Sequence, residues 1–206
     1  MRVWIRRIAI TAALAAGLWL VPLVRLVPIR AEPTPPPDDW DTSAFAEALW
    51  TERLPKAIKT AADADTVLAR LADDPAATAQ EHGRRVGVSR GYFLFVRGEG
   101  VLGPAEGKGR SLRTPGGRQL VLETGPIFGS AVRDATGLVR SSDAPSSREY
   151  NELADTLSRM AEARAAVKLK AMPNGARVRF AACAKVTSPA RFEPPLAAVP
   201  ILVEEL

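Results

Sequence analysis

The pattern of hydrophobic and polar positions divides the chain into three parts. Residues 8–24 form an apolar run without a charge, bounded on both sides by arginines. Residues 31–40 are rich in proline, and residues 41–206 mix apolar and charged positions at helical and strand spacings. We therefore predict a membrane-targeting segment at residues 1–30, a stiff linker at 31–40 and one folded domain at 41–206.

Helical spacing marks three stretches of the domain. The predicted helices cover residues 41–59, 63–81 and 146–167. Asp41, Thr42 or Ser43 can cap the first. The second stretch is one or two short helices, begun by Asp63 or Asp65 and by Asp74-Pro75. In the first stretch, Pro55 must kink or divide the helix because proline lacks the backbone N–H that a helix interior needs. The last begins with Ser146 and Glu149, which have the spacing of a capping box. Its apolar stripe is predicted to face the core.

Period-two spacing predicts the strands. They cover residues 92–96, 118–123, 177–186 and 199–203, with a brief strand at Leu138-Val139. The first is apolar at every position, so we expect it to be buried on both faces. The glycines between Gly98 and Gly103 indicate a bulge or bend in the chain. We interpret Gly107–Gly117 as a polar, glycine-rich loop.

The order of the elements indicates the fold class. Helices come first, then strands, then one long helix, then strands, which is typical of an α+β domain. Several strands that are distant in sequence, interrupted by glycine bends, favour a small, mostly antiparallel β-barrel. We therefore expect an N-terminal membrane helix followed by helices packed on such a barrel.

Charge changes this picture by excluding one class of partner. The chain has 28 basic and 23 acidic residues, and residues 1–30 hold five arginines and no acid. The remainder, 28 − 5, leaves 23 basic residues against 23 acidic ones after residue 30. A neutral domain lacks the basic face that phosphate neutralisation requires. We therefore expect no nucleic-acid partner.

The apolar run has two interpretations, a permanent anchor or a cleaved signal peptide. It is at the short end for a spanning helix. The nearest cleavage position, Ile29-Arg30-Ala31, lacks the small neutral residues that signal peptidase prefers. We favour an uncleaved single-pass anchor in the inner membrane. The arginines before the run keep the N-terminus in the cytoplasm, which places the domain in the periplasm.

Few residues of the domain carry obvious chemistry. The chain has one cysteine, Cys183, and one histidine, His82. A lone Cys and a lone His far apart in sequence favour neither a zinc site nor a thiol nucleophile, so we predict no metal, no cofactor and no catalytic residue. Cys183 alternates with basic residues that would lower its pKa, or it is a packed, unreactive thiol. His82 is expected to end a helix.

One segment, Gly125–Ala135, is the candidate binding site. Gly125 and Gly129 permit unusual backbone shapes, and Arg133 and Asp134 place two charges beside them. One interpretation is a polar rim that binds a sugar or a partner through hydrogen bonds. The other is a tight corner in which the two charges pair locally. A carboxylate pair of Asp134 and Glu123 for glycan hydrolysis is a further alternative, although no motif positions it.

Several stretches together resemble a bacterial family of predicted periplasmic lipoproteins, domain of unknown function 2291. The stretches are Ala48-Leu-Trp50, His82–Arg85, Tyr92–Gly100, Gly125–Ala135, Glu149-Tyr150 and Val178–Phe180. The resemblance covers residues 40–206. It implies a periplasmic domain with a barrel of the oligonucleotide/oligosaccharide-binding (OB) type and frequent association with sugar ABC-transport operons. This chain departs from the lipoprotein pattern because its N-terminal region has no cysteine.

Two functions follow as expectations. The first is a membrane-tethered, non-enzymatic accessory or binding module whose partners are the inner membrane and components of a sugar ABC transporter, or a carbohydrate. The alternative is an envelope hydrolase that acts on glycans. The first predicts a shallow polar surface, whereas the second requires a cleft with two acids at catalytic separation.

Overall fold

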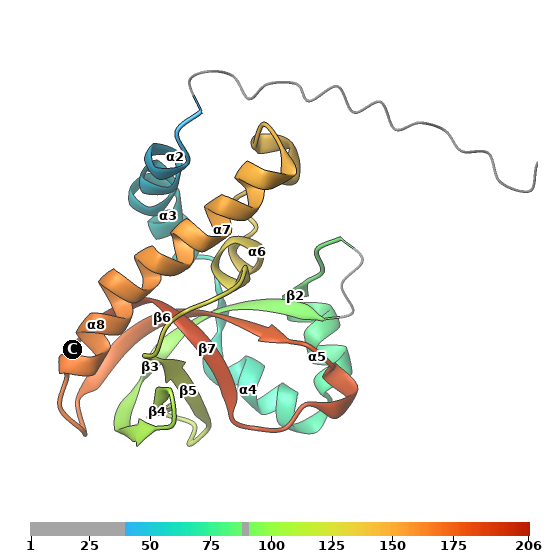
Figure 1. The fold of residues 1–206 in the computed structure, drawn as a ribbon. Coiled ribbons are helices and arrows are strands. Elements are labelled where there is room, and N and C mark those ends of the chain that lie inside the picture. The colour runs from blue at the N-terminus through green and yellow to red at the C-terminus, as the bar shows by residue number, and fades with distance from the viewer. Residues whose placement is uncertain (1–39, 88–90) are drawn as a thin grey trace, which may run out of the picture. The chain divides into compact units, whose positions relative to one another are not determined.

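The computed structural model describes residues 40–87 and 91–206 (Figure 1). The predicted anchor at residues 1–30 and all but the last residue of the predicted linker lie outside the described residues, so the anchor stays a prediction. Within the two described ranges, no helix is long and apolar enough to cross a membrane.

The first predicted helix is continuous but contains a π-helical turn. It consists of α2 (Thr42–Ala48), η1 (Leu49–Arg53) and α3 (Leu54–Ile58). Asp41 begins it, because its carboxylate accepts the backbone N–H groups of Ser43 and Ala44. Pro55 cannot donate, and the N–H of Leu54 bonds to the carbonyl of Leu49, five residues back. Pro55 therefore does not divide the helix; the chain accommodates it through the π turn that precedes it.

The remaining helices follow the predicted capping residues. They are α4 (Ala64–Asp73), α5 (Pro75–His82), α6 (Ala131–Thr136) and the long helix α7 (Ser147–Ala161), η3 (Glu162–Ala166) and α8 (Val167–Ala171). Asp63 and Asp74 cap α4 and α5. Ser146 caps α7 by accepting the N–H of Arg148, and its hydroxyl donates to the carboxylate of Glu149. The predicted helix start is therefore confirmed, although these are not the reciprocal backbone bonds of a capping box. The long helix runs four residues beyond its predicted end.

The strands form one sheet whose pairings close into a cycle. They are β1 (Ala62–Asp63), β2 (Gly83–Arg84), β3 (Tyr92–Glu106), β4 (Gly109–Arg113), β5 (Gln119–Glu123), β6 (Arg177–Val186) and β7 (Leu196–Glu205). The cycle is β3–β4–β5–β7–β6 and back to β3. Only β5–β7 is parallel within it, and β1 adds a short parallel pairing to β3. The α+β class and the mostly antiparallel sheet are confirmed.

Strand β3 is long enough to belong to two sides of the cycle. Its first ten residues pair with β6, and four residues near its end, Val101, Leu102, Ala105 and Glu106, pair with β4. The register shifts between Leu102 and Ala105, which confirms the bulge that the glycines predicted. Phe93 and Leu94 are both buried although they point to opposite faces, as expected for an apolar run.

Two predictions for the middle of the chain are wrong. The glycine-rich stretch 107–117 is not a loop throughout, because it contains β4. Gly109 fits there because a Cβ would lie 2.5 Å from Cγ1 of Val121. Arg110 in β4 is buried although arginine is a charged residue. The sequence of β4 therefore does not show the alternation of apolar and polar residues that predicts a strand. Leu138-Val139 is not a strand; it follows Gly137, whose left-handed backbone (φ 62°) ends α6.

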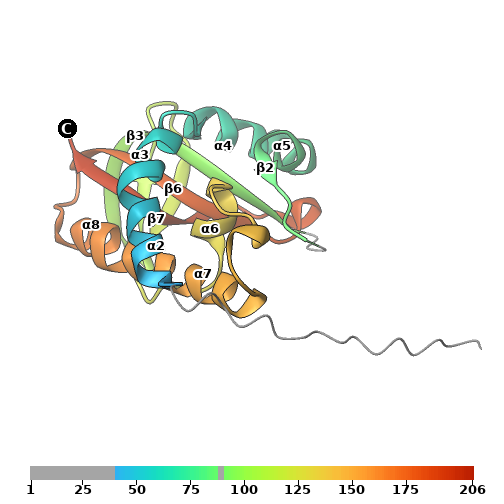
Figure 2. The same ribbon diagram turned by 90° about the horizontal axis from the view of Figure 1, so that it is seen from above.

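The domain has two hydrophobic cores on opposite faces of the sheet. Figures 1 and 2 show α4 and α5 on one side of the strands, and α2, α6 and α7 on the other. Phe180 lies in the core enclosed by the sheet with α4, whereas Ala181 and Cys183 lie in the core under α2, α6 and α7. The middle of β6 is therefore buried on both faces. Its predicted basic face exists only at the strand's two ends.

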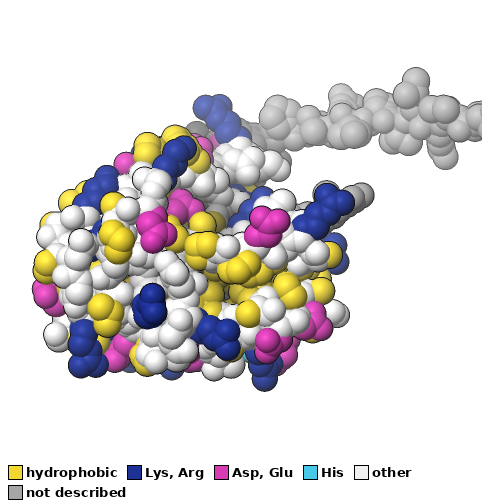
Figure 3. All heavy atoms as spheres, turned by 90° about the horizontal axis from the view of Figure 1, so that it is seen from below, with side chains coloured by type: hydrophobic (Ala, Val, Ile, Leu, Met, Phe, Trp, Pro, Cys, Tyr) yellow, Lys and Arg dark blue, Asp and Glu magenta, His cyan; other side chains and the backbone are white. Residues whose placement is uncertain are grey.

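The surface carries charges of both signs. On the face shown in Figure 3, Lys and Arg side chains are interspersed with Asp and Glu, and hydrophobic side chains gather in a hollow. This distribution agrees with the equal numbers of acidic and basic residues after residue 30.

Candidate functional site

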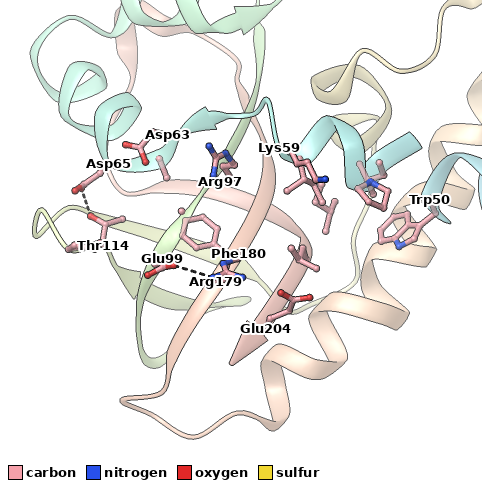
Figure 4. Close-up of a pocket in the computed structure, with 18 residues that line it drawn as sticks. Trp50, Lys59, Asp63, Asp65, Arg97, Glu99, Thr114, Arg179, Phe180 and Glu204 are labelled. Atoms are coloured by element: carbon pink, nitrogen blue, oxygen red, sulfur yellow. Dashed lines mark hydrogen bonds and ion pairs between the residues drawn. The ribbon is translucent and has the colours of Figure 1, made fainter. Parts of the chain in front are cut away.

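A cavity of about 760 Å³ opens between α3 and the sheet (Figure 4). Its walls come from η1 and α3, the β1–α4 junction, the middle of β3, the β4–β5 turn, and the neighbouring strands β6 and β7. Its volume lies within the range of about 300–1,000 Å³ that is usual for small-molecule sites. It is therefore the best-formed candidate for a binding site in the described residues.

One end of the cavity is mainly apolar. Trp50, Ile58 and Leu202 are half-buried there, and Pro55 is exposed. The π turn shapes this wall, since it keeps Leu49 and Leu54 buried while Trp50 remains at the cavity. The guanidinium carbon of Arg164, from η3, lies 5.7 Å from the centroid of the Trp50 ring, which is a cation–π contact.

The opposite end is polar and tied together by hydrogen bonds. The carboxylate of Asp65 accepts a 2.5 Å bond from the hydroxyl of Thr114 and a 2.8 Å bond from the N–H of Gly116. These bonds hold the start of α4 against the β4–β5 turn. Asp63 caps α4, and Nε of Arg97 donates to the carbonyl of Ala61 at 3.3 Å.

Four further charged side chains line the space between the two ends or lie at its rim. Glu99 and Arg179 are directly opposed on β3 and β6, with 3.6 Å between Oε1 and Nη2. Both are about half exposed, so the pair contributes little to stability. Among the described residues, the side chains of Lys59 and Glu204 bond no other side chain or backbone group. Both can therefore turn toward a bound molecule.

The predicted site residues Arg133 and Asp134 lie elsewhere, in α6. Each is only 5% exposed. Nε of Arg133 is 2.7 Å from Oδ1 of Asp134, and Nη1 donates to the carbonyl of Tyr150 at 2.8 Å. The guanidinium also stacks on the Tyr150 ring at 3.7 Å. Local pairing, the second interpretation of this segment, is therefore what the structure shows, and neither charge forms an open polar rim.

Gly125 and Gly129 flank an anchored turn. The N–H of Gly125 donates to the carbonyl of Lys108 at 2.9 Å, and Ser158 donates to the carbonyl of Gly129 at 2.8 Å. Gly129 has φ of 92°, which explains the glycine. Between them Phe128 is 84% exposed. The conformation of the backbone explains Gly129 but not Gly125. Ligand binding by this turn stays a prediction.

The lone cysteine and histidine have structural surroundings. Cys183 is fully buried, and burial raises the pKa of its thiol, so the interpretation as a reactive thiol on a basic face is wrong. His82 ends α5, as expected, with Nε2 3.5 Å from Oε1 of Glu81. No group of three or more metal-ligating side chains occurs within residues 40–87 and 91–206.

Glu123 on β5 gives a prediction for pH dependence. Burial raises the pKa of its carboxyl above the ordinary 4.5, and the nearby Lys108 partly opposes this shift. A raised pKa means that the fold disfavours the ionised form, so stability is lost as pH rises through the folded pKa. Glu123→Gln should therefore raise the thermal unfolding midpoint at pH 7, and the gain should vanish below pH 4.5. Circular dichroism melts at both pH values test this.

The matched control for that prediction is Glu106→Gln, because Glu106 is exposed at the end of β3. It should leave the midpoint unchanged at both pH values. A midpoint of Glu123→Gln that equals or falls below the native one at pH 7 would contradict the prediction.

The fold defines an α+β protein of the OB type. A solved structure described as an OB-fold protein from Thermotoga maritima MSB8 is similar, with a TM-score of 0.72 and 25% sequence identity. The alignment covers 81% of this chain and 99% of that one. No curated protein matches the sequence significantly. The expectation of an OB-type fold is confirmed.

The chain belongs to the family described as "Predicted periplasmic lipoprotein (DUF2291)", whose model matches residues 12–204. The resemblance of the separate stretches is thereby confirmed over nearly the whole sequence. Membership supports a periplasmic, membrane-associated location. The family description assigns no activity.

The cavity is not on the face that OB folds generally use. That face is formed by the second and third strands of the barrel and adjoining loops, which correspond here to β4 and β5. A smaller hollow of about 240 Å³ lies beside β4, against the end of β3. The large cavity instead faces β3, β6 and β7, and among the described residues neither β4 nor β5 contributes to its lining.

Sequence reasoning missed this cavity. Trp50 and Ile58 belong to a helical stripe that predicts burial against the core, and the remaining lining residues are scattered over five other segments. One signal was available in Pro55. A proline inside an apolar stripe predicts a change of helix direction, and with it a position where an aromatic side chain need not be fully buried.

Proposed function

We propose that this protein is a membrane-tethered, non-enzymatic periplasmic module that binds a carbohydrate for a sugar ABC transporter. The observation that carries the proposal is the cavity beside α3. It combines an aromatic wall at Trp50 with hydrogen-bonding side chains of both signs. Association with a transporter comes from the resemblance of the chain to its family and is part of the proposal.

The balance of charge in the cavity favours a neutral ligand. Asp65 is held by Thr114, and Glu99 pairs with Arg179. Besides the Glu99–Arg179 pair, the lining holds two cations, Lys59 and Arg97, and three anions, Asp63, Asp65 and Glu204, so the charges nearly balance. Cationic side chains donate and carboxylates accept, so together they match hydroxyl groups, which do both.

A glycan hydrolase is the weaker alternative. Its proposed acids were Asp134 and Glu123. Asp134 is buried against Arg133, and its two carboxylate oxygens both accept from that guanidinium. Glu123 lies on β5, outside the cavity lining. The geometry therefore does not favour that pair as a catalytic dyad.

The tether is proposed to be the apolar segment 8–24 instead of a lipid. The sequence has one cysteine, and Cys183 is buried in the middle of β6. Cys183 cannot carry a membrane lipid unless the hydrophobic core under α2, α6 and α7 opens. A helix would fulfil the same role of holding the domain at the membrane surface.

Calorimetric titration tests the binding site. The full chain in lipid nanodiscs should bind at least one of the methyl β-glycosides of glucose, galactose and xylose, with empty nanodiscs as the blank. Arg97→Met should weaken that binding by about tenfold, because it removes the guanidinium donors that the sugar hydroxyls would use.

The matched control is Phe128→Ala, which removes an exposed aromatic side chain distant from the cavity lining. It should leave the affinity unchanged. Cross-linking of the full chain in native membranes should recover a subunit of an ABC transporter. Saccharide binding without recovery of any such subunit would argue against the role in a transporter. Methyl-glycoside binding that is unchanged in Arg97→Met would argue against the cavity as the binding site.

A further inference from the structure

We propose that the ligand is a saccharide with an apolar substituent, such as an aryl or alkyl glycoside, and not a bare sugar. This inference rests on the proposed function and names the ligand class for the same cavity. It comes from the unequal chemistry of the two ends of the cavity. Figure 4 shows Trp50 at one end and Asp65 with Thr114 at the other, with Arg97 and Glu99 between them.

The end at Trp50 offers few groups to a ring of hydroxyls: the indole N–H of Trp50 and the flexible side chains of Lys59 and Glu204. Pro55, Ile58 and Leu202 offer only apolar side chains, and they come from two separate elements, α3 and β7. Water left against these side chains costs free energy, which an apolar group would recover by displacing it. Arg164, whose guanidinium carbon lies 5.7 Å from the centroid of the Trp50 ring, also pairs with Glu47 at 2.5 Å.

The other end has the opposite character. Asp63, Arg97 and Glu99 belong to the paired segments β1 and β3, so the sheet fixes their positions. Arg97 uses only Nε for the carbonyl of Ala61, which leaves its two terminal amino groups for a ligand. These groups match the hydroxyls of one sugar ring.

The size of the cavity agrees with a two-part ligand. At about 760 Å³ it is larger than one sugar ring can fill. A second sugar would place hydroxyls against Pro55, Ile58 and Leu202, where they would lose water without gaining partners. An apolar substituent fills the same space without that cost.

Matched glycosides test the ligand class. The methyl and phenyl β-glycosides of glucose, galactose and xylose are titrated against the full chain in nanodiscs, with empty nanodiscs as the blank. For the sugar that binds best, the phenyl glycoside should bind at least about tenfold tighter than the methyl glycoside, since burying two methylene equivalents already gives that factor. Ile58→Ser should reduce this ratio, and Arg97→Met should weaken both glycosides equally.

The outcomes separate the two proposals. Equal affinity of the methyl and phenyl glycosides would overturn the inference and leave carbohydrate binding intact. A phenyl preference that persists in Ile58→Ser and falls in Phe128→Ala would also overturn it, because the apolar group would then lie outside the cavity. Failure of every glycoside in both series to bind would overturn the inference together with the carbohydrate function on which it rests.

Discussion

Replacement of Arg110 by methionine should destabilise the domain by about 3–5 kcal/mol, or prevent folding. Arg110 lies on β4 and is 5% exposed. Its guanidinium donates to the carbonyls of Gly103, Leu169 and Met172 and to Oδ1 of Asn174, at distances between 2.5 and 3.3 Å.

These bonds explain the size of the expected loss. Leu169 and Met172 lie at the C-terminal end of the long helix, where backbone carbonyls have no partner within the helix. Arg110 satisfies them from the neighbouring strand, and the positive charge is favourable at that end of the helix dipole. Methionine would fill the space but leave buried carbonyls unsatisfied, which costs more than the bonds themselves contribute.

Urea unfolding followed by circular dichroism measures the effect. Arg110→Lys should lose a smaller but clear amount, because an ammonium group cannot reproduce the planar fork of five donors. Arg113→Met is the control in the same strand; Arg113 is exposed, and its replacement should change the free energy of unfolding by less than about 0.5 kcal/mol. Equal free energies of unfolding for Arg110→Met and Arg113→Met would show that the carbonyls at the end of α8 do not need the hydrogen bonds from Arg110.

Local signals in the sequence predicted much of the fold. Asp41 and Ser146 marked helix starts correctly because a cap needs only its own neighbours. The apolar run at Tyr92–Val96 predicted a doubly buried strand because each face has its own core. A helix cap is formed by residues within one turn of each other, and a doubly buried strand shows as a continuous run of apolar residues. Both features can therefore be read from a short stretch of sequence.

The failures have a common physical cause. β4 was missed because Arg110 is stabilised by carbonyls that lie 59 or more residues away in the long helix, so its burial leaves no local pattern. The cavity was missed for a similar reason. Trp50 lies on an apolar stripe, and only the π turn before Pro55 and the approach of β7 decide which residues of that stripe are buried and which face the cavity.

The segment Gly125–Ala135 illustrates a different limit. Adjacent opposite charges beside glycines fit a binding rim and a buried pair equally well at the level of sequence. Burial decides between them, and burial depends on α7, which carries Tyr150 against Arg133. The fold therefore had to be known before either interpretation could be preferred.

Removal of one partner of that buried pair should be as damaging as the loss of Arg110. Asp134→Ala leaves the Arg133 guanidinium buried without its carboxylate, which is expected to cost about 3–5 kcal/mol. Thermal and urea unfolding of the single variants Asp134→Ala and Arg133→Met, and of the double variant, measure the coupling between the two charges.

The double variant separates a structural role from a binding role. Because it removes both charges together, it should be less destabilised than the sum of the single variants by about 1–3 kcal/mol. Glu99→Ala provides the exposed comparison and should cost less than about 1 kcal/mol, since its pair with Arg179 is solvated. If Arg133 and Asp134 are structural, the folded double variant will bind glycosides with native affinity. A double variant that folds normally but no longer binds glycosides would instead support the interpretation of this segment as a binding rim.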